Sequence, residues 1–353
     1  IQVETMEKPK FKTVQEVVAA GEGLPERYLH APTGDGEVQP LNAAVPEMDI
    51  PAIDLNLLLS SSEAGQQELS KLHSALSTWG VVQVMNHGIT KAFLDKIYKL
   101  TKEFFALPTE EKQKCAREID SIQGYGNDMI LWDDQVLDWI DRLYITTYPE
   151  DQRQLNFWPE VPLGFRETLH EYTMKQRIVI EQFFKAMARS LELEENSFLD
   201  MYGESATLDT RFNMYPPCPS PDKVIGVKPH ADGSAITLLL PDKDVGGLQF
   251  QKDGKWYKAP IVPDTILINV GDQMEIMSNG IYKSPVHRVV TNREKERISV
   301  ATFCIPGADK EIQPVNELVS EARPRLYKTV KKYVELYFKY YQQGRRPIEA
   351  ALI

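Results

Sequence analysis

The chain has 353 residues, 42% of them hydrophobic, and a formal net charge of −11. This is enough apolar material for one large domain or two closely packed ones. The acidic balance argues against nucleic acid as a partner, because phosphate contacts need clustered Lys and Arg. No apolar run approaches the roughly 20 residues of a membrane-spanning helix, and residues 1–18 lack the apolar core of a secretory signal. We therefore expect a cytoplasmic protein that has no membrane partner.

The first half of the chain predicts helices with two short strands. A short helix is expected near Val14, and strands are expected at 48–54, where Pro51 marks a sheet edge, and in the β-branched run 80–86. Four longer segments have helical patterns: 65–77, 91–105, 109–116 and 163–193. In the last of these, apolar residues recur at helical spacing, which predicts one face packed on a core.

After Leu208 the pattern changes to short β-rich runs separated by turn signals, as a sandwich or barrel requires. Asp253-Gly254 lies between two such runs and predicts a hairpin, and Asn279-Gly280 is expected to form another before a strand at 281–290. Residues 208–308 therefore predict a compact antiparallel β-fold. An aromatic-rich helix is expected to follow at about 325–343. The cysteines Cys115, Cys218 and Cys304 have no CxxC spacing and are expected to be reduced thiols.

Two of the six histidines lie in the β-region. His230 and Asp232 are two residues apart, and on a strand such side chains point to the same face. His287 is expected on another strand, at 285–291, from which it can complete a triangle. Two histidines and one carboxylate with open positions opposite are typical of Fe(II) oxygenases. The His-x-Asp spacing also occurs by chance, so it does not by itself establish a metal site.

A second polar group precedes and follows these histidines. Arg297 and Ser299 share one face of the predicted next strand, where a guanidinium fork beside a hydroxyl suits a buried carboxylate. Asn213 and Tyr215 also share a strand face and can add donors. The alternative for Arg297 is a surface ion pair with a neighbouring glutamate, Glu294 or Glu296.

Taken together, these motifs resemble the 2-oxoglutarate- and Fe(II)-dependent dioxygenases of plant specialised metabolism. The resemblance covers about residue 51 to the C-terminus, with the motifs in the family's order. Only Val81-Val82 and Met214 depart from the usual residues, and neither touches the metal or co-substrate positions. The motifs that carry the resemblance are Trp79 to Ile89, Phe104 to Pro108, Gly124-Tyr125-Gly126, Asn213-x-Tyr215-Pro-Pro-Cys-Pro, His230-x-Asp232, Asn269-Val270-Gly271-Asp272, His287-Arg288-Val289 and Arg297-x-Ser299.

The resemblance implies an α+β fold with a double-stranded β-helix (jelly-roll) core flanked by helices. It divides the chain into an N-terminal extension (1–45), a helical and β N-terminal region (46–205), the jelly-roll core (206–310) and a C-terminal helical segment that closes the pocket (311–353). It further implies Fe(II) held by His230, Asp232 and His287, with 2-oxoglutarate on Arg297 and Ser299 and supporting donors from Asn213 and Tyr215. Such an enzyme uses dioxygen to oxidise a small molecule and releases succinate and CO2, with ascorbate as a supporting reductant.

Three alternatives stay open. A related Fe(II) oxidase could work without 2-oxoglutarate and use the Arg-x-Ser pair to hold its substrate's own carboxylate. The same barrel could also be a non-catalytic small-molecule binding protein, or a metal-binding jelly roll with other chemistry. The remaining histidines are expected to be structural: His30, His73, His87 and His170.

The substrate pocket is expected to be lined by Phe303, by residues 125–144, including Tyr125, and by aromatic residues of the C-terminal helix. That lining favours a mainly apolar ligand such as a specialised metabolite, hormone or xenobiotic. Arg142 and Arg211 are expected near the same pocket and would favour an anionic or strongly accepting group. The alternative for Arg142 is an exposed side chain paired with Asp138 or Asp141. The identity of the substrate, the type of oxidation and the oligomeric state do not follow from the sequence.

Overall fold

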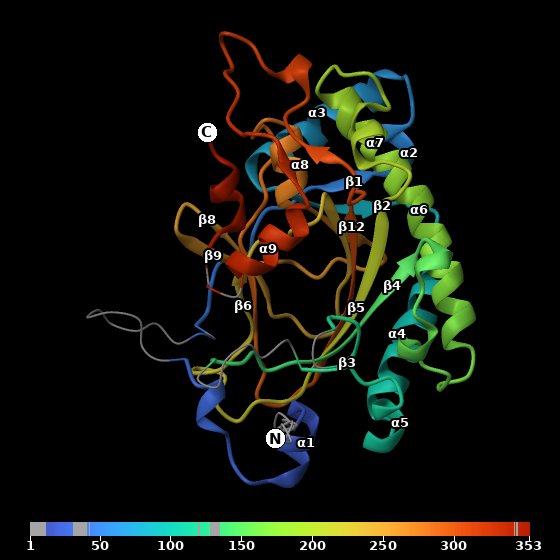
Figure 1. The fold of residues 1–353 in the computed structure, drawn as a ribbon, viewed down its shortest axis with the longest axis vertical. Helices are drawn as coiled ribbons and strands as arrows, with labels where there is room; N and C mark the ends of the chain where they lie inside the picture. The colour runs from blue at the N-terminus through green and yellow to red at the C-terminus, as the bar shows by residue number, and fades with distance from the viewer. Residues whose placement is uncertain are drawn as a thin grey trace, which may run out of the picture.

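Two facing β-sheets form the centre of the molecule (Figure 1). The computed structural model describes residues 12–30, 41, 43–118, 121–127, 135–341, 343 and 345–353. The larger sheet has eight strands in the order β1 (Ala52–Asp54), β2 (Val81–Met85), β10 (Ile266–Val270), β7 (Ile236–Leu240), β12 (Arg297–Ile305), β5 (Thr207–Tyr215), β4 (Asp141–Tyr148) and β3 (Gly124–Gly126). The smaller has four, in the order β6 (Ile225–His230), β11 (His287–Val290), β8 (Leu248–Lys252) and β9 (Lys255–Lys258). The predicted jelly-roll core flanked by helices is confirmed.

Strand alternation gives the larger sheet two different faces. On β12, Ile298 and Val300 belong to the main apolar core, whereas Arg297, Ser299 and Phe303 line a cavity between the two sheets. Strands β5 and β4 repeat this pattern, because successive side chains on a strand point to opposite faces. The face that carries the polar side chains therefore looks inward, toward the smaller sheet.

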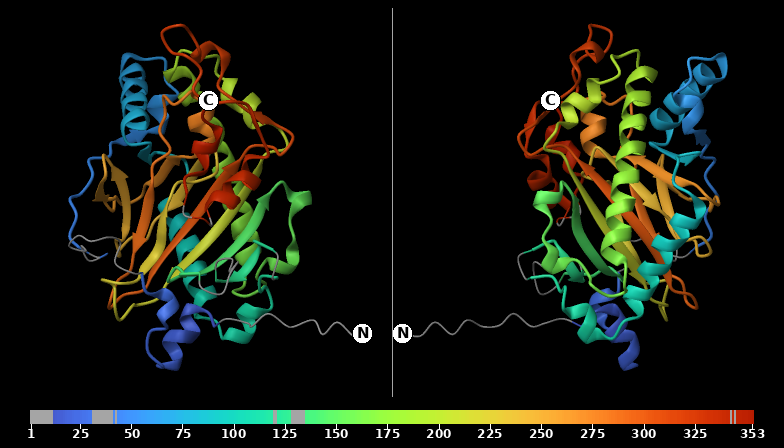
Figure 2. Two further views of the ribbon diagram at one scale, coloured as in Figure 1. Left: turned by 60° about the vertical axis from the view of Figure 1, so that its left-hand side comes forward. Right: turned by 90° about the vertical axis from the view of Figure 1, so that its right-hand side faces the viewer.

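Helices cover the outward face of the larger sheet (Figure 2). The long α6 runs along this face, and its buried side includes Phe183, Phe184 and Met187, as the helical spacing predicts. Serine or threonine caps α3 and α4, where Ser62 and Thr90 accept a hydrogen bond from a backbone N–H in the first turn. The first seven helices are α1 (Val14–Ala20), α2 (Leu55–Leu58), α3 (Glu63–Thr78), α4 (Lys91–Ala106), α5 (Thr109–Gln113), α6 (Phe165–Ser190) and α7 (Ser197–Tyr202).

The N-terminal helix is attached directly to the strand that borders the cavity. The buried Asp141 carboxylate at the start of β4 accepts hydrogen bonds from Val14 N and Gln15 N, both at 2.7 Å. Tyr28 packs edge-on against Trp139, with ring centroids 5.0 Å apart. Part of the predicted extension 1–45 lies outside the described residues. None of the described helices is long and apolar enough to span a membrane.

Hairpin predictions gave one success and one error. Asp253 and Gly254 have φ values of 49° and 74° and join β8 to β9, the left-handed turn that a tight hairpin needs. Asn279 and Gly280 have similar φ values, 51° and 75°, but they end the short helix α8 (Asp272–Met277). An Asn-Gly pair suits a hairpin turn and the end of a helix equally, because both need left-handed backbone. Here the side chain of Asn279 also donates to Pro324 O at 3.1 Å.

The C-terminal helix begins later than the prediction of 325–343 placed it. Helix α9 spans Tyr333–Tyr341, and the residues before it include β14 (Val330–Lys331), which pairs with β13 (Glu311–Ile312). Tertiary contacts override helical propensity here. Tyr327 donates to Glu275 Oε1 at 2.8 Å, which holds this segment in an extended path against α8. The strand predicted at 48–54 is also shorter, since β1 begins at Ala52. Met48 lies before β1, and its N–H donates to Lys258 O.

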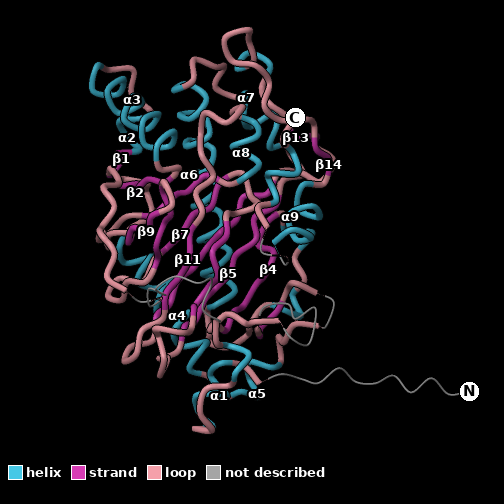
Figure 3. The backbone as a smooth tube through the Cα atoms, turned by 90° about the vertical axis from the view of Figure 1, so that its left-hand side faces the viewer, coloured by secondary structure: helices cyan, strands magenta, loops and turns pink. Residues whose placement is uncertain are grey.

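Figure 3 shows the strands at the centre and helical or loop segments around them. The core between the larger sheet and its helices is mainly apolar, and Thr302 of β12 donates a buried hydrogen bond to Gln176 of α6 at 3.1 Å. A smaller apolar cluster lies between the sheets, where Tyr215, Val227, Phe250 and Val289 surround one end of the cavity. The polar site described next is therefore enclosed on two sides by apolar packing.

Candidate metal centre and active-site cavity

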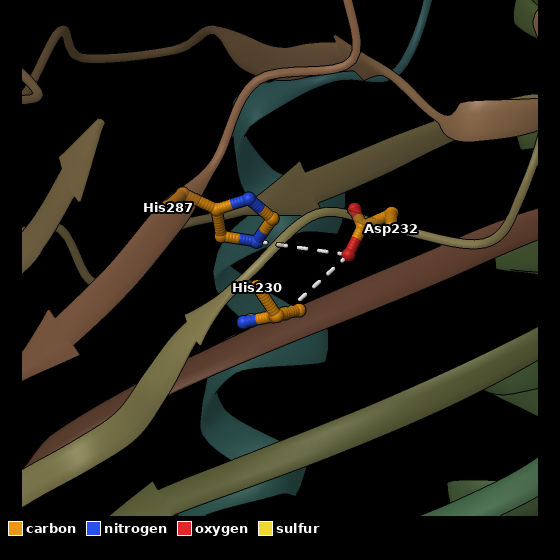
Figure 4. A group of neighbouring side chains, drawn as sticks. All are labelled: His230, Asp232 and His287. Carbon is orange, nitrogen blue, oxygen red and sulfur yellow. Dashed lines mark ion pairs between the residues drawn. The ribbon is translucent and has the colours of Figure 1, made fainter. Parts of the chain in front are cut away.

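His230, Asp232 and His287 converge at one end of the smaller sheet (Figure 4). His230 ends β6, His287 begins β11, and the two are direct partners in the sheet register. Asp232 Oδ1 lies 3.5 Å from His230 Nε2 and 3.6 Å from His287 Nε2. One possible ligand atom from each residue lies within 4.8 Å of the others. This is a triangle of two imidazoles and one carboxylate, the donor set that suits Fe(II).

The route by which Asp232 reaches this triangle differs from the expectation. Strand alternation was expected to bring His230 and Asp232 to one face, but β6 ends at His230. Asp232 lies in the loop between β6 and β7, and this loop turns the carboxylate back toward the histidines (Figure 4). The convergence was predicted correctly, whereas its geometric reason was wrong.

Backbone carbonyls orient both imidazoles. His230 Nδ1 lies 2.9 Å from Lys228 O, and His287 Nδ1 lies 3.2 Å from Pro285 O. A carbonyl oxygen can only accept, so each Nδ1 carries the proton and each Nε2 presents its lone pair toward Asp232. This tautomer is the one that a metal-binding histidine needs when Nε2 is the ligand.

Two side chains hold the carboxylate of Asp232 from behind. Thr237 Oγ1 donates to Asp232 Oδ2 at 2.6 Å, and Asn269 Nδ2 donates to the same oxygen at 2.9 Å. Oδ1 is left facing the two imidazoles. Asn269 belongs to a motif quoted for the resemblance, although no role was predicted for it. Thr237 was missed, because a threonine in an apolar strand gives no sequence signal of its own.

The electrostatics favour the ligating form of both groups. Burial acts to raise the pKa of the Asp232 carboxyl, but His287, His230 and Asn269 outweigh it and lower that pKa below its ordinary value. Burial and the neighbouring His230 lower the pKa of His287 to about 4, although Asp232 opposes this shift. Near neutral pH the site therefore combines an ionised Asp232 with a neutral His287.

A cradle for an anion lies beside this triangle. Arg297 pairs with Tyr215 across β12 and β5, and Ser299 pairs with Asn213. Asn213 Nδ2 donates to Ser299 Oγ at 3.2 Å, and the Arg297 guanidinium lies 5.1 Å from the Tyr215 ring centroid. All four predicted residues line one cavity together with His230, Asp232 and His287.

Arg297 is only 4% exposed, which excludes the surface ion pair considered for it. Glu296 instead lies 3.2 Å from Lys102. Within the described part of the chain, Arg297 Nε and Nη1 are buried without a hydrogen-bond partner. A buried guanidinium with free donors costs free energy unless a ligand supplies acceptors. The carboxylate of a bound co-substrate fits that requirement.

A second cavity adjoins the first, with His230, Asp232, Arg211 and Phe303 lining both. Its wall combines the predicted Arg142, Arg211 and Phe303 with aromatic residues of α9. Tyr144 was not predicted individually. It stacks on Phe303 with ring centroids 6.1 Å apart and donates to Asp209 Oδ2 at 2.9 Å. The remaining lining residues are Ile122, Gly233, Ser234, Ile305, Val334, Tyr337, Phe338 and Tyr341.

Arg142 is 1% exposed, so the exposed alternative is wrong. Its Nη1 donates to the carbonyls of Ile122 and Gly124, at 2.6 and 3.0 Å. Part of this guanidinium therefore supports the loop that precedes β3. Arg211 lies on the neighbouring strand, opposite Tyr144 in the register, and is only half-buried.

Tyr125 lies away from both cavities, which corrects its assignment to the substrate pocket. It is 3% exposed, and its ring packs edge-on against Phe104, with centroids 5.7 Å apart. The reason is the pleat of β3, where Tyr125 pairs with the core residue Leu143 rather than with Arg142. Its place on a cavity-bordering strand did not determine which way its side chain points.

The other histidines make contacts typical of structural residues. His87 Nδ1 accepts from Ile89 N at 3.2 Å, and His73 Nδ1 lies 3.1 Å from Ser190 O. His170 Nδ1 lies 3.0 Å from Arg153 Nη2. For His30, burial lowers the pKa of the imidazole below its ordinary value. In the described ranges, His230, Asp232 and His287 form the one group with metal-binding geometry. Cys115, Cys218 and Cys304 are buried free thiols, as expected.

Comparison with known proteins agrees with this fold and site. Residues 206–306 match the family model of the 2OG-Fe(II) oxygenase superfamily. Residues 50–161 match the model described as the N-terminal region of the non-haem dioxygenase in morphine synthesis. The chain belongs to the 2OG-Fe(II) oxygenase superfamily.

Its similarity to individual members extends over most of the chain. Protein SRG1 of Arabidopsis thaliana is 38% identical over 94% of this chain and 92% of its own length. Codeine O-demethylase of Papaver somniferum is 39% identical over 86% of this chain and 85% of its own. The crystal structure of JOX2 in complex with 2OG, Fe and JA has a TM-score of 0.87 at 31% identity and covers 98% of both chains. This chain is therefore a 2-oxoglutarate- and Fe(II)-dependent dioxygenase of the plant type that acts on a small molecule.

Proposed function

We propose that His230, Asp232 and His287 are the iron ligands of this dioxygenase. The observation that carries the assignment is the orientation of the three side chains. Both Nε2 atoms face Asp232 Oδ1, while both Nδ1 atoms donate to backbone carbonyls. The bound metal would supply the redox chemistry, in which dioxygen oxidises the substrate while 2-oxoglutarate is converted to succinate and CO2.

Arg297 and Ser299 bind the far carboxylate of 2-oxoglutarate in this proposal, with Asn213 and Tyr215 beside them. The unpartnered, buried donors of Arg297 support this role, because they are matched to a two-oxygen acceptor. An oxidase that uses the same pair for its substrate's own carboxylate is the alternative. It would show no dependence on 2-oxoglutarate and no succinate.

The substrate is a mainly apolar small molecule that carries an anionic or strongly accepting group. Phe303, Tyr144 and the aromatic side chains of α9 provide the apolar walls. Arg211 and Arg142 provide two guanidinium groups at the same cavity. Because Arg211 lines both cavities, whereas the 1% exposed Arg142 lines one and holds the Ile122 and Gly124 carbonyls, Arg211 is the stronger candidate for the substrate's charge.

The division of the chain at residues 45, 205 and 310 is part of the same proposal. The family match at residues 206–306 supports the core boundaries, and α9 supports a C-terminal segment that closes the cavity. We expect a cytoplasmic location and expect ascorbate to support turnover. Dioxygen and the small molecule are the expected partners.

A metabolite screen that monitors succinate release in the presence of Fe(II), 2-oxoglutarate and ascorbate identifies the substrate. An acidic substrate and its methyl ester are then compared in the wild type and in Arg211→Leu and Arg142→Leu. We expect the wild type to prefer the acid by at least about ten-fold, the value of one charged hydrogen bond, and Arg211→Leu to lose most of that preference. A wild type that treats acid and ester alike rejects the proposed substrate charge, and an unchanged preference in both variants rejects these two residues as selectors.

A further inference from the structure

The loop that carries Asp232 is held by donors from two separate parts of the chain. Each carbonyl from Ala231 to Ser234 accepts one hydrogen bond. Three of these come from the junction of β10 and α8: Asp272 N donates to Asp232 O at 2.8 Å, Gln273 Nε2 to Gly233 O at 2.7 Å, and Gln273 N to Ser234 O at 3.1 Å. The fourth comes from α9, where Tyr337 Oη donates to Ala231 O at 2.8 Å.

Ala231 lies between the two proposed ligands His230 and Asp232, so its carbonyl fixes the peptide that joins them. The ring of Tyr337 lies directly on the same loop. A Cβ built on Gly233 would approach two ring atoms of Tyr337 to 2.6 Å, so glycine is required for this close contact. Tyr337 is therefore in contact with the loop through its hydroxyl and through its ring.

A second aromatic contact leads from α9 to a proposed ligand. The Tyr337 ring stacks on Tyr341, with centroids 5.5 Å apart and an interplanar angle of 22°. The Tyr341 ring meets the imidazole of His230 edge-on, with centroids 5.6 Å apart. Both tyrosines also line the substrate cavity. One face of α9 thus touches the cavity, the ligand loop and a ligand ring.

The same helix is anchored next to this loop at its start. Tyr333 Oη donates to Asp272 Oδ2 at 2.8 Å, and Arg346, beyond the end of α9, donates to Asp272 Oδ1 at 3.3 Å. Asp272 is fully buried, and its own N–H is the one that donates to Asp232 O. The position of α9 and the shape of the ligand loop are consequently fixed by shared residues.

We propose that Tyr337 is a positioning residue that couples docking of the C-terminal helix to the metal-ligand loop, so that metal binding and helix docking stabilise each other. The inference rests on the proposed assignment of the iron ligands. Coupling of this kind is reciprocal, because the free energy that a docked helix adds to metal binding equals the free energy that metal adds to docking. Tyr337 thereby links the wall of the substrate cavity to the geometry at the metal.

The test uses Co(II) as the probe, without 2-oxoglutarate or substrate, in the full-length protein. Its affinity is measured by calorimetry and by the visible absorption of the bound ion, and hydrogen exchange of the α9 amides is followed with and without Co(II). The variants are Tyr337→Phe, which removes the hydroxyl and keeps the ring, and Gly233→Ala, which pushes the ring away from the loop. Tyr340→Phe is the matched control, because it makes the same change on the same helix outside the residues lining the cavity.

We expect Co(II) to slow exchange in α9 of the wild type and of Tyr340→Phe. In Tyr337→Phe, Co(II) should bind about three- to ten-fold more weakly, as the loss of one hydrogen bond predicts, and most of the Co(II)-dependent protection should disappear. Gly233→Ala should show the same loss of affinity and protection, and it provides the test if Tyr337→Phe does not fold. The coupling is overturned if both variants bind Co(II) with wild-type affinity, or if Co(II) does not change the hydrogen exchange of the α9 amides in the wild type. A wild type that binds no Co(II) instead overturns the ligand assignment itself.

Discussion

The two regions around the cavity are built in different ways. The proposed co-substrate end lies on adjacent central strands, β5 and β12, where pairing fixes Arg297 against Tyr215 and Ser299 against Asn213. The substrate end adds the β3–β4 segment and α9, which are far apart in sequence, to Arg211 of β5 and Phe303 of β12. Central strands hold side chains rigidly, whereas segments at the rim depend on a few contacts each. The proposed co-substrate residues thus lie on rigid strands, whereas the proposed substrate cavity combines those strands with segments that can vary.

The largest effect should come from the proposed metal ligands, which line the same cavity as the co-substrate end. Replacing His230, Asp232 or His287 by Ala should weaken Fe(II) binding more than about 100-fold and abolish turnover, because two ligands no longer form a facial site. The fold should persist, since the apolar cores do not depend on these side chains. Iron content after anaerobic reconstitution and circular dichroism check both points. His170→Ala is the control, and full iron occupancy in one of the three variants removes that residue from the triad.

The next largest effect should be at the co-substrate cradle. Arg297→Lys should raise the KM for 2-oxoglutarate about ten- to a hundred-fold, because an ammonium cannot replace the two-donor fork. Steady-state kinetics at fixed substrate measures this. Arg288→Lys, on the outward side of β11, is the matched control, and the rim variant Phe338→Ala should change only the constant for the organic substrate. A shift confined to the organic substrate in Arg297→Lys would favour the oxidase alternative.

A smaller effect should come from the side chains behind Asp232. Asn269→Ala should lower Fe(II) affinity about ten-fold, at the lower end of the range for groups that orient a metal ligand, because Thr237 keeps its bond to Asp232 Oδ2. Combining it with Thr237→Val should cost more than the sum of the single changes, since Oδ2 then loses both donors. Titration with Fe(II) under nitrogen measures all three variants. Strict additivity would show that the two donors act independently.

The sequence predicted which residues form the triangle and the co-substrate end, because the signals for these residues are local. His230, Asp232 and His287 belong to short motifs, and on β12 and β5 the alternation places Arg297, Ser299, Asn213 and Tyr215 on one face. Strand periodicity is a property of the chain itself and needs no knowledge of the partner strand. What local pattern did not reveal was the loop that returns Asp232 to the histidines, since β6 stops at His230.

The rim was harder because its contacts join distant segments. Tyr125 was placed in the pocket, yet the pleat of β3 turns it into the core beside Phe104. The start of the C-terminal helix was wrong, because pairing of Val330 with Ile312 competes with helix formation. Tyr337 lies 106 residues from the carbonyl that it binds, a separation that no motif spans. Helical propensity and strand membership say nothing about such pairs.

Strand alternation in β5 and β12 also limits how the gene can change in length. A single-codon insertion or deletion at the start of β12 that shifts the pairing of the whole strand by one residue would send Arg297 and Ser299 toward the helices while Ile298 and Val300 enter the cavity. A single-residue insertion in the loop before β3 or beyond the end of α9 would exchange no such faces. New substrates should therefore arise in this lineage through length changes at the rim and through point substitutions, the one kind of change that β5 and β12 tolerate.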